Sequence, residues 1–150
     1  KGNPKNVKGL DDLCGLIVAA ETGDVATTYA KEQSEKCVAA GRPAVTVNEY
    51  PEATQSLLTL ENGRADVIIH DYPLSAYMVE HSEGKLSMAG DQFNEAPYGM
   101  AIGKGNVALR DALMKGLDAI IASGEYQQIL EKYGVAEIGL AKASYNAASK

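Results

Sequence analysis

The sequence predicts an α/β domain built on a mostly parallel sheet. Short apolar runs of strand length, at residues 16–20, 44–50 and 67–69, alternate with longer segments of helical spacing. Each run ends in a turn-forming sequence, and the segments between the runs are long enough for right-handed crossover connections. With 150 residues, 45% of them hydrophobic, the chain is large enough to bury the core of one ordinary domain.

The charge of the chain excludes two classes of partner. The formal net charge is −6, and the lysines are scattered singly, so a nucleic-acid partner and a membrane-surface role are not expected. The longest apolar run, residues 16–20, is far shorter than the roughly 18 residues that a membrane span requires. Residues 1–6 contain neither an initiator Met nor a signal peptide, and we expect an interior portion of a longer polypeptide.

The N-terminal third reads as a linker followed by a strand-helix unit. Residues 1–9 are polar and contain Gly and Pro, which is typical of a linker or hinge. Residues 10–13 predict one short helical turn. Residues 16–20 are apolar on both faces, as expected for a strand of a parallel sheet covered by helices. A helix is then predicted over residues 25–40, with Asp24 as its N-cap.

This first helix has a thin apolar stripe. Lysines and glutamates occupy the positions expected to face water, and the residues 41–43 (Gly-Arg-Pro) form a stop signal. The residues expected to face inward are Val25, Tyr29, Ala30 and Val38.

The middle of the chain continues the alternation. A strand over residues 44–50 ends at a proline, and a helix follows over residues 52–61. The short strand at 67–69 precedes a helix over residues 73–81, which is expected to bury Leu74, Tyr77 and Met78.

The last sixty residues change style. Short strands are predicted over residues 86–89 and 98–103. Asn106 caps a long amphipathic helix, and a second amphipathic helix follows Ser123-Gly124. Two helices in series do not extend the alternation, so they are expected to belong to another layer or lobe. The tail, residues 136–150, is small and polar and should be loosely ordered unless it docks on something.

Asp71 is the most informative polar residue of the sequence. It follows the strand at 67–69 within His70-Asp71-Tyr72-Pro73, and ligands of open α/β sheets bind at the carboxyl ends of strands. A buried, partly desolvated carboxylate there would need a cation, a donor or a proton. The alternative is that Asp71 only caps the helix that follows.

No complete catalytic constellation is found in the sequence. His70 and Asp71 are adjacent, and successive residues of a strand point to opposite faces, so they form a dyad only if the strand has already ended. His81 is predicted to be a solvated cation near a helix end. Residues 21–24 offer backbone amides at a helix N-terminus, but the sequence lacks a phosphate-loop pattern, and capping is the favoured role of Asp24.

Two cysteines, Cys14 and Cys37, are too few for a zinc cage. They lie before the first strand and near the end of the helix after it, places that are neighbours in a strand-helix unit. A disulfide would close a loop of about 24 residues and contribute on the order of 3 kcal/mol. Two separate buried thiols are the alternative.

Short motifs in a fixed order give the chain a resemblance to a known family. It resembles the extracellular solute-binding proteins of ABC importers, specifically the polar amino-acid family, over essentially its whole length. The motifs are LDDLCG at 10–15, TG at 22–23, GRAD at 63–66, DYP at 71–73, APYGMAI at 96–102 and GEYQQIL at 124–130.

The resemblance implies one lobe of a type II periplasmic-binding-protein fold. Residues 1–9 would be a hinge, 10–99 the second solute-binding lobe, and 100–135 the return hinge strand and two helices of the missing first lobe, followed by the tail at 136–150. Those two helices would lose the sheet that they normally cover. They are expected to fold back on their own lobe or to exchange with a second copy in a homodimer.

The resemblance also implies binding residues. Asp71 matches the aspartate that receives the ligand's α-ammonium, and His70 and Tyr72 flank it. Gly23, Asp24 and Val25 fall where the family holds the α-carboxylate with hydroxyl residues. Those hydroxyls are replaced here, and Asp24 would repel a carboxylate, which makes a cationic or otherwise altered solute a candidate. The family's carboxylate-binding Arg would lie outside this sequence.

The function implied is that of a non-enzymatic receptor. It would capture a small polar solute, an amino acid or related amine, and present it to an ABC permease, outside the cytoplasm in the periplasm or on a lipid anchor. No cofactor and no metal are expected. One alternative is a cyclohexadienyl-dehydratase-like enzyme on the same scaffold, with Glu21, Asp24, His70 and Asp71 as candidate proton-transfer residues. Another is the effector domain of a cytosolic regulator, which a disulfide would disfavour.

Overall fold

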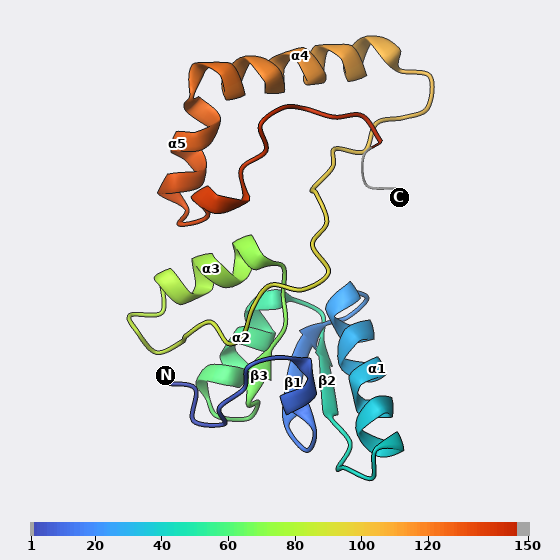
Figure 1. The fold of residues 1–150 in the computed structure, drawn as a ribbon, viewed down its shortest axis with the longest axis vertical. Helices are drawn as coiled ribbons and strands as arrows, with labels where there is room; N and C mark the ends of the chain where they lie inside the picture. Colours follow the sequence, from blue (N-terminus) through green and yellow to red (C-terminus); the bar gives the residue numbers. More distant parts are fainter. Residues whose placement is uncertain (1, 147–150) are drawn as a thin grey trace. The chain divides into compact units, whose positions relative to one another are not determined.

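The computed structural model describes residues 2–146, which form two compact units (Figure 1). We call Lys1–Asp91 the N-terminal unit and Gln92–Lys150 the C-terminal unit. The hinge and lobe boundaries implied by the resemblance stay predictions. None of the helices in the described part of the chain is both long and apolar enough to cross a membrane.

The N-terminal unit contains a three-stranded parallel sheet with strand order β2-β1-β3. The strands are β1 (Ile17–Glu21), β2 (Thr46–Tyr50) and β3 (Val67–Ile68). Central β1 pairs with β2 along its whole length, and the three middle residues of β1 are fully buried. The predicted α/β class with a parallel sheet is therefore confirmed.

Helices cover both faces of this sheet. The connections β1-α1-β2 and β2-α2-β3 run in opposite directions along the sheet, so right-handed crossovers place α1 and α2 on opposite faces (Figure 1). A short 3₁₀ turn precedes β1, as predicted, and α3 follows β3. Their bounds are Leu10–Leu13 for the 3₁₀ turn η1, Val25–Ala39 for α1, Ala53–Glu61 for α2 and Tyr72–Glu80 for α3.

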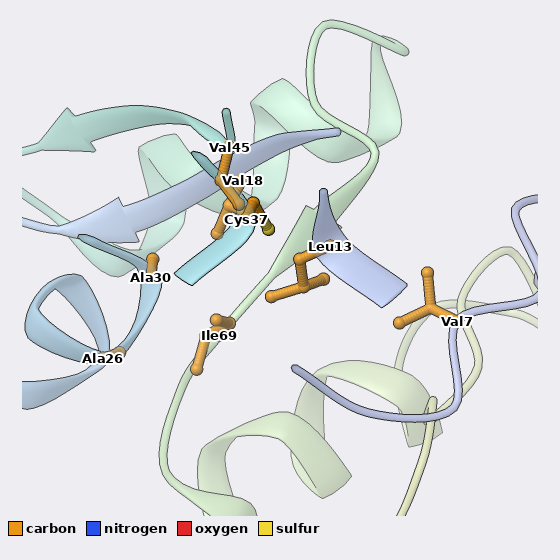
Figure 2. Close-up of a cluster of buried hydrophobic side chains, with 8 residues drawn as sticks. All are labelled: Val7, Leu13, Val18, Ala26, Ala30, Cys37, Val45 and Ile69. Atoms are coloured by element: carbon orange, nitrogen blue, oxygen red, sulfur yellow. The ribbon is translucent and has the colours of Figure 1, made fainter. Parts of the chain in front are cut away.

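One apolar cluster lies between η1, the sheet and α1. Figure 2 shows its side chains, which come from the linker, η1, the central strand β1, α1 and the segments just before β2 and just after β3. The buried members are Val7, Leu13, Val18, Ala26, Ala30, Cys37, Val45 and Ile69. The cluster packs η1 against the sheet and α1. Through the buried side chain of Val7, the linker before η1 is also part of this core.

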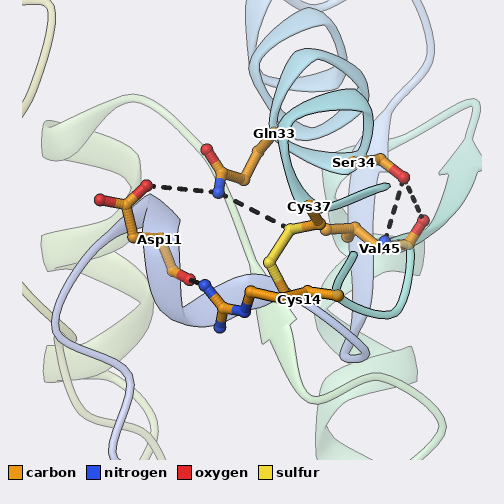
Figure 3. Close-up of a disulfide and its surroundings, with 7 residues drawn as sticks. Asp11, Cys14, Gln33, Ser34, Cys37 and Val45 are labelled. Carbon is orange, nitrogen blue, oxygen red and sulfur yellow. Dashed lines mark hydrogen bonds between the residues drawn. A yellow bond between two sulfur atoms is a disulfide. The ribbon is translucent and has the colours of Figure 1, made fainter. Parts of the chain in front are cut away.

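The predicted disulfide between Cys14 and Cys37 is present, with the two Cα atoms 5.6 Å apart (Figure 3). Polar bonds surround it. The Gln33 amide donates toward Cys37 Sγ at 3.7 Å, and Arg42 Nη1 donates to the Asp11 carbonyl at 2.9 Å. Covalent and polar links thus attach η1 to the far end of α1.

The predicted inward face of α1 is partly wrong. Val25 and Val38 are 52% and 59% exposed, whereas Thr27 and Gln33 are buried. The two polar side chains are buried because each finds a partner: Thr27 Oγ1 donates to the Glu21 carbonyl at 2.8 Å, and Gln33 bonds to the disulfide. Because Cys37 is bonded to Cys14, the side of α1 that carries Cys37 is buried, and the side that carries Val25 and Val38 is exposed.

The C-terminal unit is helical. It contains α4 (Val107–Ser123), α5 (Glu125–Lys132) and a 3₁₀ turn η2 (Ala136–Ile138). The predicted cap forms, since Asn106 Oδ1 accepts from Leu109 N at 3.2 Å. Gly124, in the left-handed region with φ +84°, separates α4 from α5 as the sequence predicted.

Two predicted strands are absent. Residues 86–89 and 98–103 form no strand in the structure, because neither segment pairs with another. The first part of the predicted loose tail docks on α4: Ala143 N donates to Asp118 Oδ1 at 2.9 Å, and Arg110 lies 5.1 Å from the centre of the Tyr145 ring. The rest of that tail, residues 147–150, lies outside the described residues.

Candidate functional site

The carboxyl edge of the parallel sheet gathers the polar residues that the sequence analysis singled out. Strand β1 ends at Glu21, and the turn that follows contains Gly23 with φ +82°, a backbone conformation that suits glycine. Asp24 is then the N-cap of α1, and its Oδ1 accepts from Ala26 N at 2.9 Å. The predicted cap is confirmed, and it fixes one oxygen of this carboxylate.

Three ionisable side chains meet at this edge. Glu21, Asp24 and His70 each offer a ligand atom within 4.8 Å of the other two, and all three side chains are partly buried. They come from the end of β1, the start of α1 and the segment after β3. Because β3 ends at Ile68, His70 lies beyond the strand, and the alternation that separates neighbouring residues no longer applies to it.

His70 is oriented by α2, the helix on the face of the sheet opposite α1. Its Nε2 lies 2.8 Å from Ser56 Oγ, and Ser56, in α2, is fully buried. The Ser56 hydroxyl donates its proton to the Ala53 carbonyl at 2.7 Å, so it accepts from the imidazole. This assigns the ring proton to Nε2 and leaves a lone pair on Nδ1.

Burial favours the neutral form of this imidazole. Burial lowers the pKa of His70 below its usual value, and the negative charges of Asp24, Glu21 and Asp71 oppose that shift without reversing it. A neutral imidazole beside carboxylates can accept a proton or bind a cation.

Asp71 occupies a different environment from the one expected. It is exposed rather than buried and desolvated. It stands at the N-cap position of α3 with φ −54° and ψ 142°, but its side chain makes no capping hydrogen bond to that helix. The alternative of a pure capping role is therefore not supported, and ligand contact by Asp71 stays a prediction.

The other predicted ligand-binding residues lie along the same edge. Val25 and Tyr72 are the first residues of α1 and α3, and Gly23 is exposed in the turn before α1. The turn is held to the sheet because Thr22 N donates to the Tyr50 carbonyl at 2.8 Å. Their roles in binding stay predictions, as does that of His70.

Two polar residues with structural roles were missed, one at the site and one at the opposite edge of the sheet. Ser56 orients His70. This role could not be predicted, because a serine inside an apolar helical pattern carries no signal of its partner. Asp66 Oδ2 accepts from Ile17 N at 2.9 Å and fixes the amino edge of the sheet. The aspartate of the GRAD motif was the available signal, but its partner lies 49 residues away in the sequence.

A hollow of about 330 Å³ lies beside α2. Its lining consists of Tyr50, Gln55, Leu58, Thr59, Asn62 and Arg64. It contains none of the residues predicted to bind a ligand.

Comparison with known proteins finds curated relatives, while no family model matches. The arginine-binding protein ArgT of Corynebacterium glutamicum is 34% identical over 137 residues, which are 91% of this chain and 45% of the relative. The L-cystine-binding protein TcyJ of Escherichia coli is 28% identical over 138 residues, or 92% of this chain and 49% of the relative. The chain thus spans about half the length of these relatives.

Solved structures match to the same extent. An ancestral arginine-binding protein bound to arginine has a TM-score of 0.68 and 28% identity, over 85% of this chain and 54% of that one. The ancestral amino acid-binding protein AncCDT-1, a precursor of cyclohexadienyl dehydratase, has a TM-score of 0.71 and 25% identity, over 89% and 54%.

Proposed function

We propose that this chain takes part in capturing a small polar solute for import. It is a homologue of the amino-acid-binding proteins of ABC transporters and has one lobe of their type II periplasmic-binding-protein fold. The observation that carries the proposal is the acidic carboxyl edge of the sheet. There Glu21 and Asp24 lie within 4.8 Å of His70, and Asp71 is close enough for its charge to act on the same imidazole. Ligands of open α/β sheets bind at this edge.

The charges at the edge favour an amine. In the proposed complex Asp71 receives the solute's ammonium group, a charge-assisted contact suited to an exposed carboxylate. The backbone amides of the turn at Gly23, Asp24 and Val25 face the solute's other end. Because the carboxylate of Asp24 repels an α-carboxylate there, we favour an amine or another cationic or altered solute over an ordinary α-amino acid.

The remaining half of the relatives' length is the proposed second wall of the site. One wall buries too little of a small ligand for high affinity, so binding by this chain alone should be weak. In the whole protein, closure of two lobes around the solute would raise the affinity and signal the loaded state to the permease.

The homologues support three further parts of the proposal. The protein binds its solute without converting it, its partner is a membrane permease, and it works outside the cytoplasm. The homologues include a periplasmic arginine-binding protein of Mannheimia haemolytica. The Cys14–Cys37 disulfide supports the same location, because such bonds persist mainly in oxidising compartments, and it disfavours the cytosolic regulator.

For the C-terminal unit we propose exchange between two copies. Its helices expose large apolar side chains, with Val107 50%, Leu109 44%, Ile129 51% and Tyr133 46% accessible. An apolar surface of this kind favours association. In the homodimer, α4 and α5 of one copy would pack on the other copy. Light scattering would measure a dimer mass, whereas a monomer with both helices solvated and rigid contradicts the exchange.

A titration monitored by NMR tests the binding proposal directly on this chain. Arginine, cystine, glutamine and putrescine are added up to millimolar concentration while backbone amide shifts are recorded. We expect shifts at Gly23, Val25 and Tyr72, largest for the cationic solutes, and their loss in Asp71→Asn. Shifts confined to α4 and α5, or identical shifts in Asp71→Asn, would contradict the proposed site.

An enzyme is the second candidate, and AncCDT-1 favours it because that neighbour is a precursor of cyclohexadienyl dehydratase. A neutral His70 beside two carboxylates could transfer a proton. Incubation with prephenate and arogenate distinguishes the two functions. Release of the aromatic product, lost in His70→Asn, would replace the receptor by an enzyme.

A further inference from the structure

The cluster of Glu21, Asp24 and His70 has the composition of a metal site. Its two carboxylate oxygens and one imidazole nitrogen lie within 4.8 Å of one another. Imidazole favours transition metals over Mg²⁺ and Ca²⁺, and zinc accepts mixed sets of histidine and carboxylate ligands. We propose that these three side chains bind one divalent transition-metal ion, with zinc as the type case.

The imidazole is prepared to act as a ligand. Its Nε2–H is engaged by Ser56, whose own proton goes to the Ala53 carbonyl, so Nδ1 keeps its lone pair. Metal-binding histidines characteristically donate their other ring N–H to a fixed partner, which sets the tautomer and the ring orientation. Ser56 is fully buried, which makes it a rigid partner.

One carboxylate is held in the same way. Asp24 Oδ1 accepts from Ala26 N at 2.9 Å, and its other oxygen remains for a cation. The backbone of Glu21 is fixed as well, because its carbonyl accepts from Thr27 Oγ1 at 2.8 Å. Supporting bonds from α1 and α2, outside the cluster, therefore position donors from three separate elements.

The spacing suits an ion after a small adjustment. Ligand atoms at zinc distances of roughly 2.0–2.2 Å around a tetrahedron lie about 3.4 Å apart. The three ligand atoms lie within 4.8 Å of one another, so they reach that spacing by closing on the ion by at most about 1.4 Å, and all three side chains are only partly buried. The same partial exposure gives an ion a path from solvent and leaves a fourth position for water. A cation would also relieve the repulsion between the two carboxylates.

This inference goes beyond the proposed function, because it requires neither a solute nor a second lobe. The test is a titration of the 150-residue chain with Zn²⁺ in competition with a chromophoric chelator, without any amino acid. We expect one equivalent to bind, and His70→Asn and Glu21→Gln each to weaken binding by about tenfold or more. The matched control is His81→Asn, which changes the chain's other histidine, at the end of α3, and should leave the affinity unchanged.

Imidazole ¹⁵N spectra give a second readout. Before zinc is added, His70 should carry its proton on Nε2, and zinc should shift Nδ1 of His70 while His81 stays unchanged. Because Glu21→Gln is isosteric and leaves the Ser56 bond intact, its thermal unfolding should match the parent chain, which separates lost ligation from lost folding. Absence of saturable binding, binding that survives both substitutions, or a shift at His81 alone would overturn the proposal.

Discussion

Helices α1 and α4 begin in the same way and end up in opposite environments. Each starts at a side-chain cap, Asp24 bonding to Ala26 N and Asn106 bonding to Leu109 N. Helix α1 has 15 residues and buries five of them, whereas α4 has 17 residues and none is fully buried. The comparison shows that similar caps and spacing mark both helices, while burial requires a sheet for the helix to cover.

The two units should accordingly be stabilised differently. The N-terminal unit has a sheet, a disulfide and most of the fully buried apolar side chains of the described residues. In the C-terminal unit only Val135 and Ala143, among the residues described there, are buried and apolar. Isolated helices of this length are marginal in water, so α4 should depend on its caps, on the docked tail and on association.

Truncating one leucine in each unit tests this difference in burial. Leu13 is 2% exposed and Leu109 is 44% exposed. Leu13→Ala should lower the free energy of unfolding of the N-terminal unit by about 3–4 kcal/mol, because it leaves a cavity among η1, the sheet and α1. Leu109→Ala should cost under about 1 kcal/mol.

Urea unfolding followed by amide NMR measures both changes, since resonances of β1 and of α4 report on the two units separately. Equal losses in the two variants would contradict the difference in burial. A large loss in Leu109→Ala that grows with protein concentration would instead locate the missing cover of α4 in a second copy.

The disulfide is the next largest effect, and it should act on one unit only. Replacing Cys14 and Cys37 together by serine, which avoids a lone thiol, should lower the free energy of unfolding of the N-terminal unit by about 3 kcal/mol in the chain-entropy model. The α4 resonances should be unaffected. Reduction of the parent chain with dithiothreitol should give the same result, and coincident loss of α4 structure would show that the two units unfold together.

The contrast also explains which elements the sequence could predict. The helical turn before β1, the three strands of the sheet, helices α1 to α3 and the cap of α4 have strong local signals, and they were predicted within a few residues of their bounds. The strands at 86–89 and 98–103 were wrong because a strand depends on a partner far away in the sequence, which an apolar run does not specify. The inward face of α1 was misjudged for the same reason, since Cys37 is drawn in by Cys14.

For the site, the members could be predicted from the sequence, but their positions relative to one another could not. Glu21, Asp24 and His70 were all candidates, yet their meeting depends on β1 and β3 being neighbours in the sheet. The bond from Ser56 to His70 was not predictable, because a serine in a helix carries no mark of its partner. Asp71 was expected to be buried, but the chain turns outward into α3 just after β3, and its carboxylate is exposed.

The smallest expected change in stability concerns the interior of α4. Gly116 lies inside this helix, and among the described residues nothing comes within 4 Å of a Cβ added there. Gly116→Ala should therefore stabilise α4 by about 0.5–1 kcal/mol, because glycine in a helix interior loses more backbone freedom than alanine. Amide hydrogen exchange across α4 measures the gain, and Ala119→Gly, at an exposed position of the same helix, is the control that should lose as much. A helix that rests on its local signals alone must respond to both changes with opposite signs. If Gly116→Ala weakens α4 or lowers the dimer fraction, a surface from another chain packs closely against Gly116, and the exposed helix is one face of an interface.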